Sequence, residues 1–384
     1  MVIWPFIPAA GYSERLSWLT SIHQSKTTEQ RASLLTRPRL TLRFSFHLSD
    51  LELAHAKIMA KSVFDSGRDG SVLLPLWNEL AALASVSAGA TTITTDTTTS
   101  SYTATGQAVI WASSGDYEIV TISSLTDAVL TLSAPVVGDF TNCKIMPLVS
   151  AWFVQKLSLA RKPSTINTVS AGFIVPVVPV IESGTLYANY LTHPVITDPA
   201  IGVGSLREVY GPTSESFDSK TGLIEQRATR DYGAQIAAMS WLVSGRSAIH
   251  ALKEWLHFCR GKREAFWLPS WYADFNLVDP IASGSASIVV SENGLSGTLS
   301  DFHIMAVTRA GDQHYFSVDS IGNGVTGTEV LVLSEAAGVN IAVVDIYKIC
   351  FLTMSRFNSD QIEIKHNPPN LARIVVPVVE CPLP

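Results

Sequence analysis

Charged side chains are scarce in this sequence of 384 residues. They make up 16% of the chain, against a usual share of about 25%. Lys and Arg total 27 and Asp and Glu total 33, which gives a formal net charge of −6. This balance argues against a protein that binds nucleic acid by neutralising phosphates, and the 47% hydrophobic content argues against disorder. Interface centres are depleted in charge, so the composition favours a surface covered by other subunits. A monomer with a Ser/Thr-rich surface fits it too.

Cysteine and long apolar runs are also scarce. The four cysteines are Cys143, Cys259, Cys350 and Cys381. None belongs to a CxxC pair, so neither a disulfide framework nor a structural zinc is expected. The longest apolar stretch, residues 171–181, contains two prolines and is shorter than the ~20 residues of a membrane-spanning helix. The first residues carry no positive charge, so no signal peptide is expected.

The sequence contains an internal repeat of domain size. Residues of the first part return in the second at an offset that drifts from 194 to 201 residues. The repeated residues are Glu29-Gln-Arg31 with Glu225-Gln-Arg227, Phe64 with Phe258, Gly67 with Gly261, Pro75 with Pro269, Trp77 with Trp271, and residues 174–178 with 375–379. A slowly drifting offset is typical of a diverged duplication, and it predicts two copies of one fold over residues 14–182 and 208–384.

Each copy is expected to begin with a strand and a helix. Residues 40–48 alternate between apolar and polar side chains, which predicts a strand with one buried face. Residues 235–243 are apolar at both sets of positions and predict a more deeply buried strand. The helices are predicted from apolar residues at helical spacing. These are Leu51, Ala54, Ile58 and Ser62 in the first copy and Ile249, Leu252, Leu256 and Cys259 in the second. Ser49 or Asp50 could cap the first helix and Ser247 the second.

Short strands separated by turn residues follow each helix, and five of them in each copy fit a small barrel. The parent sheet is expected to resume at residues 152–159 and 351–357. The predicted fold is mainly β with minor α, an α+β chain built by tandem duplication with a small β-barrel inserted in each copy. The predicted organisation is an N-terminal arm (1–28), copy 1 (29–84 plus 151–182) with barrel 1 (85–150), a linker (183–207), and copy 2 (208–282 plus 351–384) with barrel 2 (283–350).

Motifs for catalysis, cofactors or metals are absent. The sequence has no phosphate-binding loop, dinucleotide-binding glycines, nucleophile elbow or HExxH. His250 and His257 share one helix face with no third ligand nearby, so we expect a solvated face rather than a metal site. Asp274 and Asp279 could form a carboxylate pair for glycoside hydrolysis, but the first copy has no matching acids. We therefore predict no catalytic residue, no metal and no cofactor.

The repeated side chains are interpreted as structural. Arg31 and Arg227 each stand beside a Glu and a Gln and are read as ion-pair residues that hold the fold. Phe64, Phe258, Gly67, Gly261, Trp77 and Trp271 are read as anchors of the repeat. Aromatic residues such as Trp267, Trp271 and Tyr272 could form a platform that stacks on a sugar, although such residues are more often core or interface anchors.

The repeated unit resembles the distal tail protein family of long-tailed phages and phage-like gene transfer particles. The resemblance rests on residues 225–227, 258–261 and 266–269, which read Glu-Gln-Arg, Phe-Cys-Arg-Gly and Phe-Trp-Leu-Pro. The amino-terminal pattern also resembles tail structural proteins of such phages, in Trp4-Pro5, residues 14–20, 29–31 and Pro38-Arg39. A simple member of the family carries one ring-forming domain, whereas this sequence carries two copies.

The resemblance implies a virion structural protein of the tail tip, assembled in the host cytoplasm. The family forms a ring that extends the tail tube, and its ring-forming domain is a tube-like β-sandwich with a flanking helix. The implied partners are other copies of the chain, the tail tube, tape measure and baseplate hub proteins, and tail fibres or receptor-binding proteins held by the inserted barrels. Six copies would each fill one ring position, or three copies would each fill two in a pseudo-sixfold ring. The alternatives are a module that binds host-surface glycans and, third, a hydrolase that uses Asp274.

Overall fold

A computed structural model describes residues 2–64, 70–154, 157–160, 167–181, 184, 186–199, 208–211, 214–228, 234–367 and 370–382. These residues form 28 strands and two α-helices, so the prediction of a mainly β fold with minor α is confirmed. We call residues 2–181 the first half and residues 208–382 the second half.

The elements of the first half are β1 (Val2–Ile3), β2 (Tyr12–Ser17), β3 (Thr20–Gln24), β4 (Glu29–Ser33), β5 (Arg39–Leu48), α1 (Asp50–Phe64), β6 (Ser71–Pro75), the 3-10 helix η1 (Trp77–Glu79), β7 (Ala81–Val86), β8 (Thr92–Thr94), β9 (Gln107–Ser113), β10 (Asp116–Thr126), β11 (Val129–Leu132), β12 (Phe140–Phe153), β13 (Ser158–Ala160) and β14 (Asn167–Val175). Between the halves lie β15 (Asn189–Tyr190) and β16 (His193–Pro194).

The elements of the second half are β17 (Glu208–Gly211), β18 (Ser214–Phe217), β19 (Glu225–Ala228), β20 (Ala234–Ser244), α2 (Arg246–Cys259), β21 (Ala265–Pro269), β22 (Ser287–Ser291), β23 (Ser300–Thr308), β24 (Gln313–Asn323), β25 (Thr328–Leu333), η2 (Val343–Asp345), β26 (Ile346–Phe357), β27 (Gln361–His366) and β28 (Leu371–Glu380).

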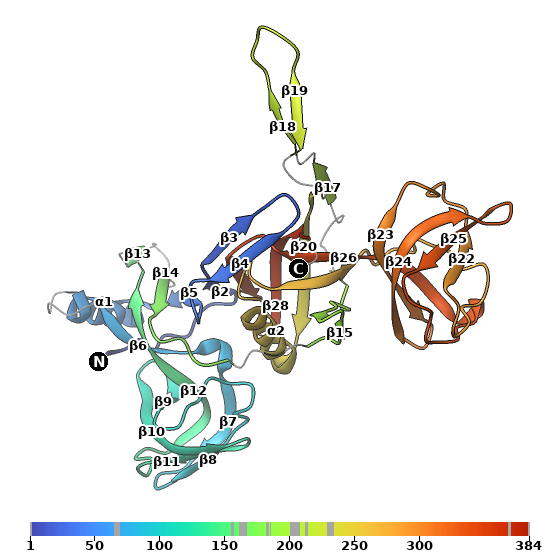
Figure 1. The fold of residues 1–384 in the computed structure, drawn as a ribbon. Helices are drawn as coiled ribbons and strands as arrows, with labels where there is room; N and C mark the ends of the chain where they lie inside the picture. The colour runs from blue at the N-terminus through green and yellow to red at the C-terminus, as the bar shows by residue number, and fades with distance from the viewer. Residues whose placement is uncertain are drawn as a thin grey trace.

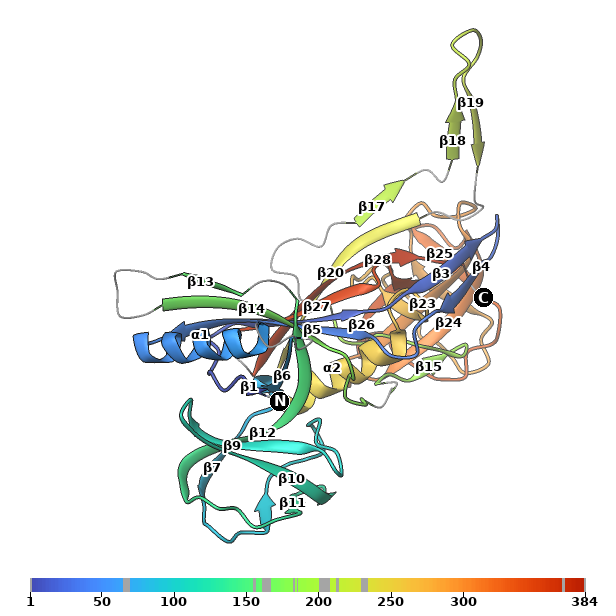
Figure 2. The ribbon, with the colours of Figure 1, turned by 90° about the vertical axis from the view of Figure 1, so that its left-hand side faces the viewer.

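One antiparallel sheet runs through both halves of the chain. Its strands follow the order β17–β20–β28–β27–β2–β5–β14–β13, and Figures 1 and 2 show it crossing the centre of the molecule. The strand over residues 40–48 is confirmed as β5, in which every second side chain is buried. On β20 the expectation of two apolar buried faces is wrong, because Leu242 is exposed beside buried Trp241.

The segment expected to be an N-terminal arm lies within this sheet. β2 pairs with β5 on one side and with β27 on the other. β1 pairs in parallel with β6, and β3 and β4 form a hairpin. Tyr12 and Leu16 are buried, so β2 is held by its apolar face as well as by its backbone.

One helix packs beside each of the long strands β5 and β20. α2 buries Ile249, Leu252, Leu256 and Cys259, as predicted. The predicted face of α1 is wrong, because Leu51 and Ile58 are exposed. The buried residues of α1 are Leu53, Ala56, Met59, Ala60 and Val63.

The two helices begin differently. Before α1, the amide of Glu52 donates to Ser49 Oγ over 3.3 Å and the amide of Ser49 donates to Glu52 Oε2 over 3.0 Å. This reciprocal arrangement is a capping box, and it identifies Ser49 as the cap. α2 has Gly245 at its N-cap and no side-chain capping bond, so Ser247 does not cap it.

Two further groups of strands, β7–β11 and β22–β25, lie apart from one another at the edges of the molecule (Figure 1). Each has its own hydrophobic core. β12 pairs with β7 and β9 along its first part and with β6 and β14 along its last. β26 likewise pairs with β23 and then with β28. The boundaries expected at residues 150 and 350 therefore fall inside continuous strands, and the strands expected to resume at 152 and 351 are the ends of β12 and β26.

The described part of the expected linker over residues 183–207 packs against the second half. Val195 forms a parallel bridge with Trp267, and the amide of Ile196 donates to Trp267 O over 2.9 Å. Both aliphatic side chains are buried. Residues 200–207 lie outside the described residues.

Candidate functional site at the seam between the two halves

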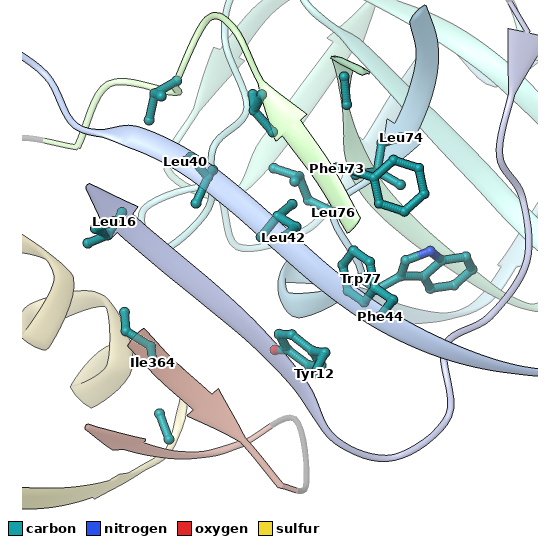
Figure 3. Close-up of a cluster of buried hydrophobic side chains, with 14 of the residues drawn as sticks. Tyr12, Leu16, Leu40, Leu42, Phe44, Leu74, Leu76, Trp77, Phe173 and Ile364 are labelled. Atoms are coloured by element: carbon teal, nitrogen blue, oxygen red, sulfur yellow. The ribbon is translucent and has the colours of Figure 1, made fainter. Parts of the chain in front are cut away.

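The seam is the place where β2, from the first half, lies between β5 and β27. In its register Glu14 stands opposite Leu42 of β5 and Ile364 of β27. Figure 3 shows Tyr12 and Leu16 on β2, with Leu42 on one neighbouring strand and Ile364 on the other. The alternation of β2 places Glu14 between Tyr12 and Leu16 on the buried face of the strand.

A buried ionic cluster is built around Glu14, which is 3% exposed. Lys253 Nζ of α2 lies 2.8 Å from Glu14 Oε2 and donates to Oε1 over 3.1 Å. Asn78 Nδ2 of η1 donates to Oε1 over 2.8 Å. His366 Nε2 of β27 lies 3.0 Å from the same oxygen. Four elements that are distant in the sequence therefore meet at one carboxylate.

The electrostatics of the cluster keep it ionised. Burial alone raises the pKa of Glu14, but Lys253 and His366 outweigh burial and lower it to about 2. Burial lowers the pKa of Lys253, and Glu14 and Glu79 outweigh that effect and raise it. The ring of Tyr12 stacks on His366 at 4.3 Å between centroids, and the pKa of its hydroxyl is raised by burial and then by Glu14.

A cavity of about 260 Å³ adjoins the cluster, and two of its polar lining residues, Glu79 and Arg246, are held by hydrogen bonds within the chain. Arg246 Nη2 donates to Glu79 O over 2.8 Å. The Glu79 carboxylate accepts from the amide and the hydroxyl of Ser101 over 2.6 and 2.7 Å. Glu14 remains ionised at neutral pH, so it has no proton to give as a general acid. The arrangement is suited to holding the two halves in one register, a role attested for buried polar groups elsewhere.

The β3–β4 hairpin extends the seam onto the second half. Glu29 of β4 accepts from Arg356 of β26 through both oxygens, over 2.6 and 3.2 Å. Burial raises the pKa of Glu29, and the hydrogen bond from Arg356 outweighs burial and lowers it. At the first residue of β3, the amide and the hydroxyl of Thr20 donate to the carboxylate of Asp360 over 2.9 and 2.8 Å. The hairpin of the first half is thus anchored at both ends to the second half.

The repeated arginines lie in different environments. The side chain of Arg31 on β4 is mostly buried, with Nε 3.7 Å from Glu29 Oε1. Arg227 is exposed on β19, in a hairpin that stands clear of the sheet in Figures 1 and 2. The difference arises because β3–β4 is docked on the other half of the chain.

The repeated residues around the helix ends also differ. Phe64 is half exposed and its ring lies 5.4 Å from that of Phe153. Phe258 stacks on Trp255 at 5.4 Å. Gly67 lies outside the described residues. Gly261 has φ +68°, and a Cβ there would lie 3.1 Å from Trp18 Cβ and from Asp360 Cα, so the seam requires a glycine at this position.

The two repeated tryptophans follow equivalent strand ends but differ in burial. Trp77 is 1% exposed and meets Trp111 edge to face at 5.3 Å. Trp271 is only partly buried, in the left-handed region at φ +56°. Its carbonyl accepts from Lys348 Nζ over 3.0 Å. Only Trp77 is therefore a fully buried anchor.

The residues considered for chemistry are dispersed. Asp274 accepts hydrogen bonds from the Ser270 hydroxyl and from the amide of Phe351, the latter over 2.8 Å, while Asp279 is exposed. The solvated face expected around His250 and His257 is wrong, because His257 and Lys253 are buried. Burial, then Lys253, lowers the pKa of His257 to about 4. The aromatic platform is also absent from the described residues, since Trp267 is buried while Tyr272 is exposed. No group of three or more potential metal ligands occurs in the part of the chain that the structure describes.

Sequence reasoning missed the Glu14 cluster. One signal was available, because Lys253 lies four residues after Ile249 and three before Leu256. These spacings place a lysine on the apolar face of α2, where a charge requires a partner. The partner itself is 239 residues away.

Comparison with protein-family models and with curated proteins gives no match. Over the described ranges, none of the helices has the length and apolar character needed to cross a membrane.

Proposed function

We propose that the chain is a virion structural protein of a phage tail tip. It would form a ring that extends the tail tube and connects it to the baseplate and to receptor-binding proteins. The observation that carries the proposal is the single sheet through both halves, which β2 joins by pairing with β5 and β27. Sheet edges are a liability unless they are paired, and closure into a ring pairs them.

The element order supports a tandem duplication. The counterparts are β2 and β17, the β3–β4 and β18–β19 hairpins, β5 and β20, α1 and α2, β6 and β21, β12 and β26, β13 and β27, and β14 and β28. The start of each half also corresponds. The amide of Trp4 donates to Leu73 O, as that of Ile196 donates to Trp267 O. These observations favour a copy boundary before residue 195 in place of a free linker.

The sheet favours three copies over six. Eight strands per chain would give 24 strands in a ring of three. At a strand spacing of about 4.8 Å and a tilt of up to about 40°, such a ring is about 37 to 48 Å across between backbones. Each chain would then fill two positions of a pseudo-sixfold ring. The ionic cluster at Glu14 would fix the angle between those two positions.

The two outlying strand groups are proposed to be inserted small barrels. Each is joined to the body through a continuous strand, β12 or β26, and this connection would hold it at a set angle. Exposed apolar residues such as Val344 and Tyr347 lie next to the start of β26. They offer contact area for fibres or receptor-binding proteins.

The test is the assembly state of the purified full chain. Light scattering should give three times the chain mass of 41.5 kDa, and negative-stain images should show rings with a central hole and six lobes. A sixfold mass would support the ring with one position per chain. A closed dimer, or a monomer at every concentration, would contradict the ring.

A further inference from the structure

The β18–β19 hairpin presents apolar side chains to solvent. Phe217 is 70% exposed, and Leu223, in the connecting loop, is 91% exposed. The hairpin is a separate two-stranded sheet that projects from the body in both views (Figures 1 and 2). An isolated two-stranded hairpin is marginally stable in water. Exposed apolar groups on such an element indicate a partner surface.

Its counterpart within the chain shows how such a hairpin is held. β4 and β19 share the sequence Glu-Gln-Arg-Ala, and each hairpin follows a strand that pairs with the long strand of its own half. The β3–β4 hairpin seats on the other half through Glu29 and Arg356. By the same relation, the equivalent seat for β18–β19 would lie on the first half of another copy.

The register identifies that seat. Leu148 pairs with Pro75 and Leu352 pairs with Pro269, so Trp152 on β12 stands where Arg356 stands on β26. Trp152 is 41% exposed. It lines a groove of about 460 Å³ with Val177, Arg37 and Arg39. This groove is the hairpin seat of the first half.

The residues of the second hairpin and its seat differ from those of the first in a matched way. Gln24 lies opposite Glu29 on the first hairpin, and Phe217 lies opposite Glu225 on the second. The charged Arg356 that receives the first hairpin corresponds to the apolar Trp152. The exposed apolar side chain of Phe217 therefore matches the apolar Trp152 of the seat. Arg37 and Arg39 are exposed at the groove and would offer positive charge to Glu225.

We propose that the β18–β19 hairpin of one copy docks in the hairpin seat of the next copy, with Phe217 against Trp152. The contact is head-to-tail and repeats around the ring until the last copy meets the first. The proposal rests on the ring described above, because it supplies the junction between its chains. It names a second copy of this chain as the occupant of the groove.

Two single-cysteine variants of the full chain test the contact. F217C and W152C chains are mixed and oxidised, and the products are separated without reductant. A covalent dimer formed only in the mixture is expected. The matched control pairs F217C with V325C, since Val325 is more exposed than either test position but lies in the loop between β24 and β25. The native cysteines are all buried.

A second variant separates this proposal from the ring itself. Phe217→Asp alters an exposed residue, so the chain should fold, and the expected result is loss of the trimer mass in light scattering. Rings that persist in the Phe217→Asp chain, without the mixed disulfide, would overturn the docking and leave the ring standing. A wild-type chain that remains monomeric, together with no mixed disulfide between the F217C and W152C chains, would overturn both.

Discussion

Glu14 Oε2 lies 2.8 Å from Lys253 Nζ, and the two side chains come from opposite halves of the chain. Both are almost fully buried, with 3% and 9% of their side-chain surface exposed. The pair lies where β2 joins the sheet strands of the two halves. Variants of these two residues therefore measure how strongly the halves are held together.

Removing the cation should destabilise the seam strongly. Lys253→Met leaves the Glu14 carboxylate buried beside an apolar group, and we expect a loss of about 3–5 kcal/mol in unfolding free energy. The double variant Glu14→Leu with Lys253→Met should recover much of this loss, because no charge is then buried. Urea denaturation of the wild type, both single variants and the double variant gives the coupling between the two residues. A Lys253→Met chain as stable as the wild type would contradict the conclusion that the Glu14–Lys253 pair stabilises the contact between the two halves.

Acid should weaken the fold through Glu14. The pKa of this group is about 2 in the folded chain and 4.5 as its ordinary value, so the unfolded state takes up a proton first as the pH falls. The contribution is present above pH 4.5 and is lost towards pH 2, at a cost of about 3 kcal/mol. The Glu14→Gln variant should show a flatter dependence of stability on pH in this window. Parallel curves for the two chains would show that Glu14 carries no such linkage.

His257 predicts a second dependence at milder pH. Its pKa is about 4 in the folded chain, against 6.5 as its ordinary value, so only the unfolded state becomes protonated between these values. Stability should fall by about 3 kcal/mol as the pH is lowered from 6.5 to 4. His257→Gln should remove this slope, which chemical denaturation at intervals of pH can follow. His250, partly exposed on the same helix, provides a control, and His250→Gln should leave most of the slope in place, because burial is the main cause of the lowered pKa of His257.

Gly261→Ala should be costly for two separable reasons. The residue has φ +68°, and a Cβ would come within 3.1 Å of Trp18 Cβ and Asp360 Cα. Gly297 has φ +70° with nothing within 4 Å of such a Cβ. Gly297→Ala therefore measures the backbone penalty alone, about 1–2 kcal/mol. The additional loss of unfolding free energy in Gly261→Ala measures the cost of placing a Cβ against Trp18 and Asp360. Equal losses in the two variants would show that these neighbours can move aside.

The two repeated tryptophans should differ in their effect on stability. Trp77→Ala empties a fully buried site and should cost about 3–5 kcal/mol. Trp271 is partly buried and should cost clearly less, because less apolar surface returns to water. Melting curves of both variants decide the point. Equal losses would mean that the two loops are more alike than their burial indicates.

Local patterns predicted much of the fold. The alternation over residues 40–48 identified β5, and the helical spacing from Ile249 to Cys259 identified the buried face of α2. The same reasoning chose the wrong face of α1, because Leu51 and Ile58 are apolar yet exposed. Burial there is set by which side meets the sheet, and the buried residues Ala56 and Ala60 are small and weakly hydrophobic.

The candidate site depended on contacts that no local pattern contains. Glu14 interrupts the apolar positions of β2, so this strand read as part of an arm. Its charge is tolerated because Lys253 and His366 meet it from elements 239 and more residues away. The repeat was inferred from single residues such as Trp77 and Trp271, and their different burial could not be predicted from the sequence.

The pairing of β2 with β27 joins residues 12–17 to residues 361–366. During synthesis the ribosome must therefore make residues 18–360 before β27 is available to pair with β2. Until then β2 can pair only with β5, and its other edge stays open to neighbouring nascent chains. β27 thus completes the sheet on the open edge of β2, and the long loop closure predicts slow, late formation of this pair.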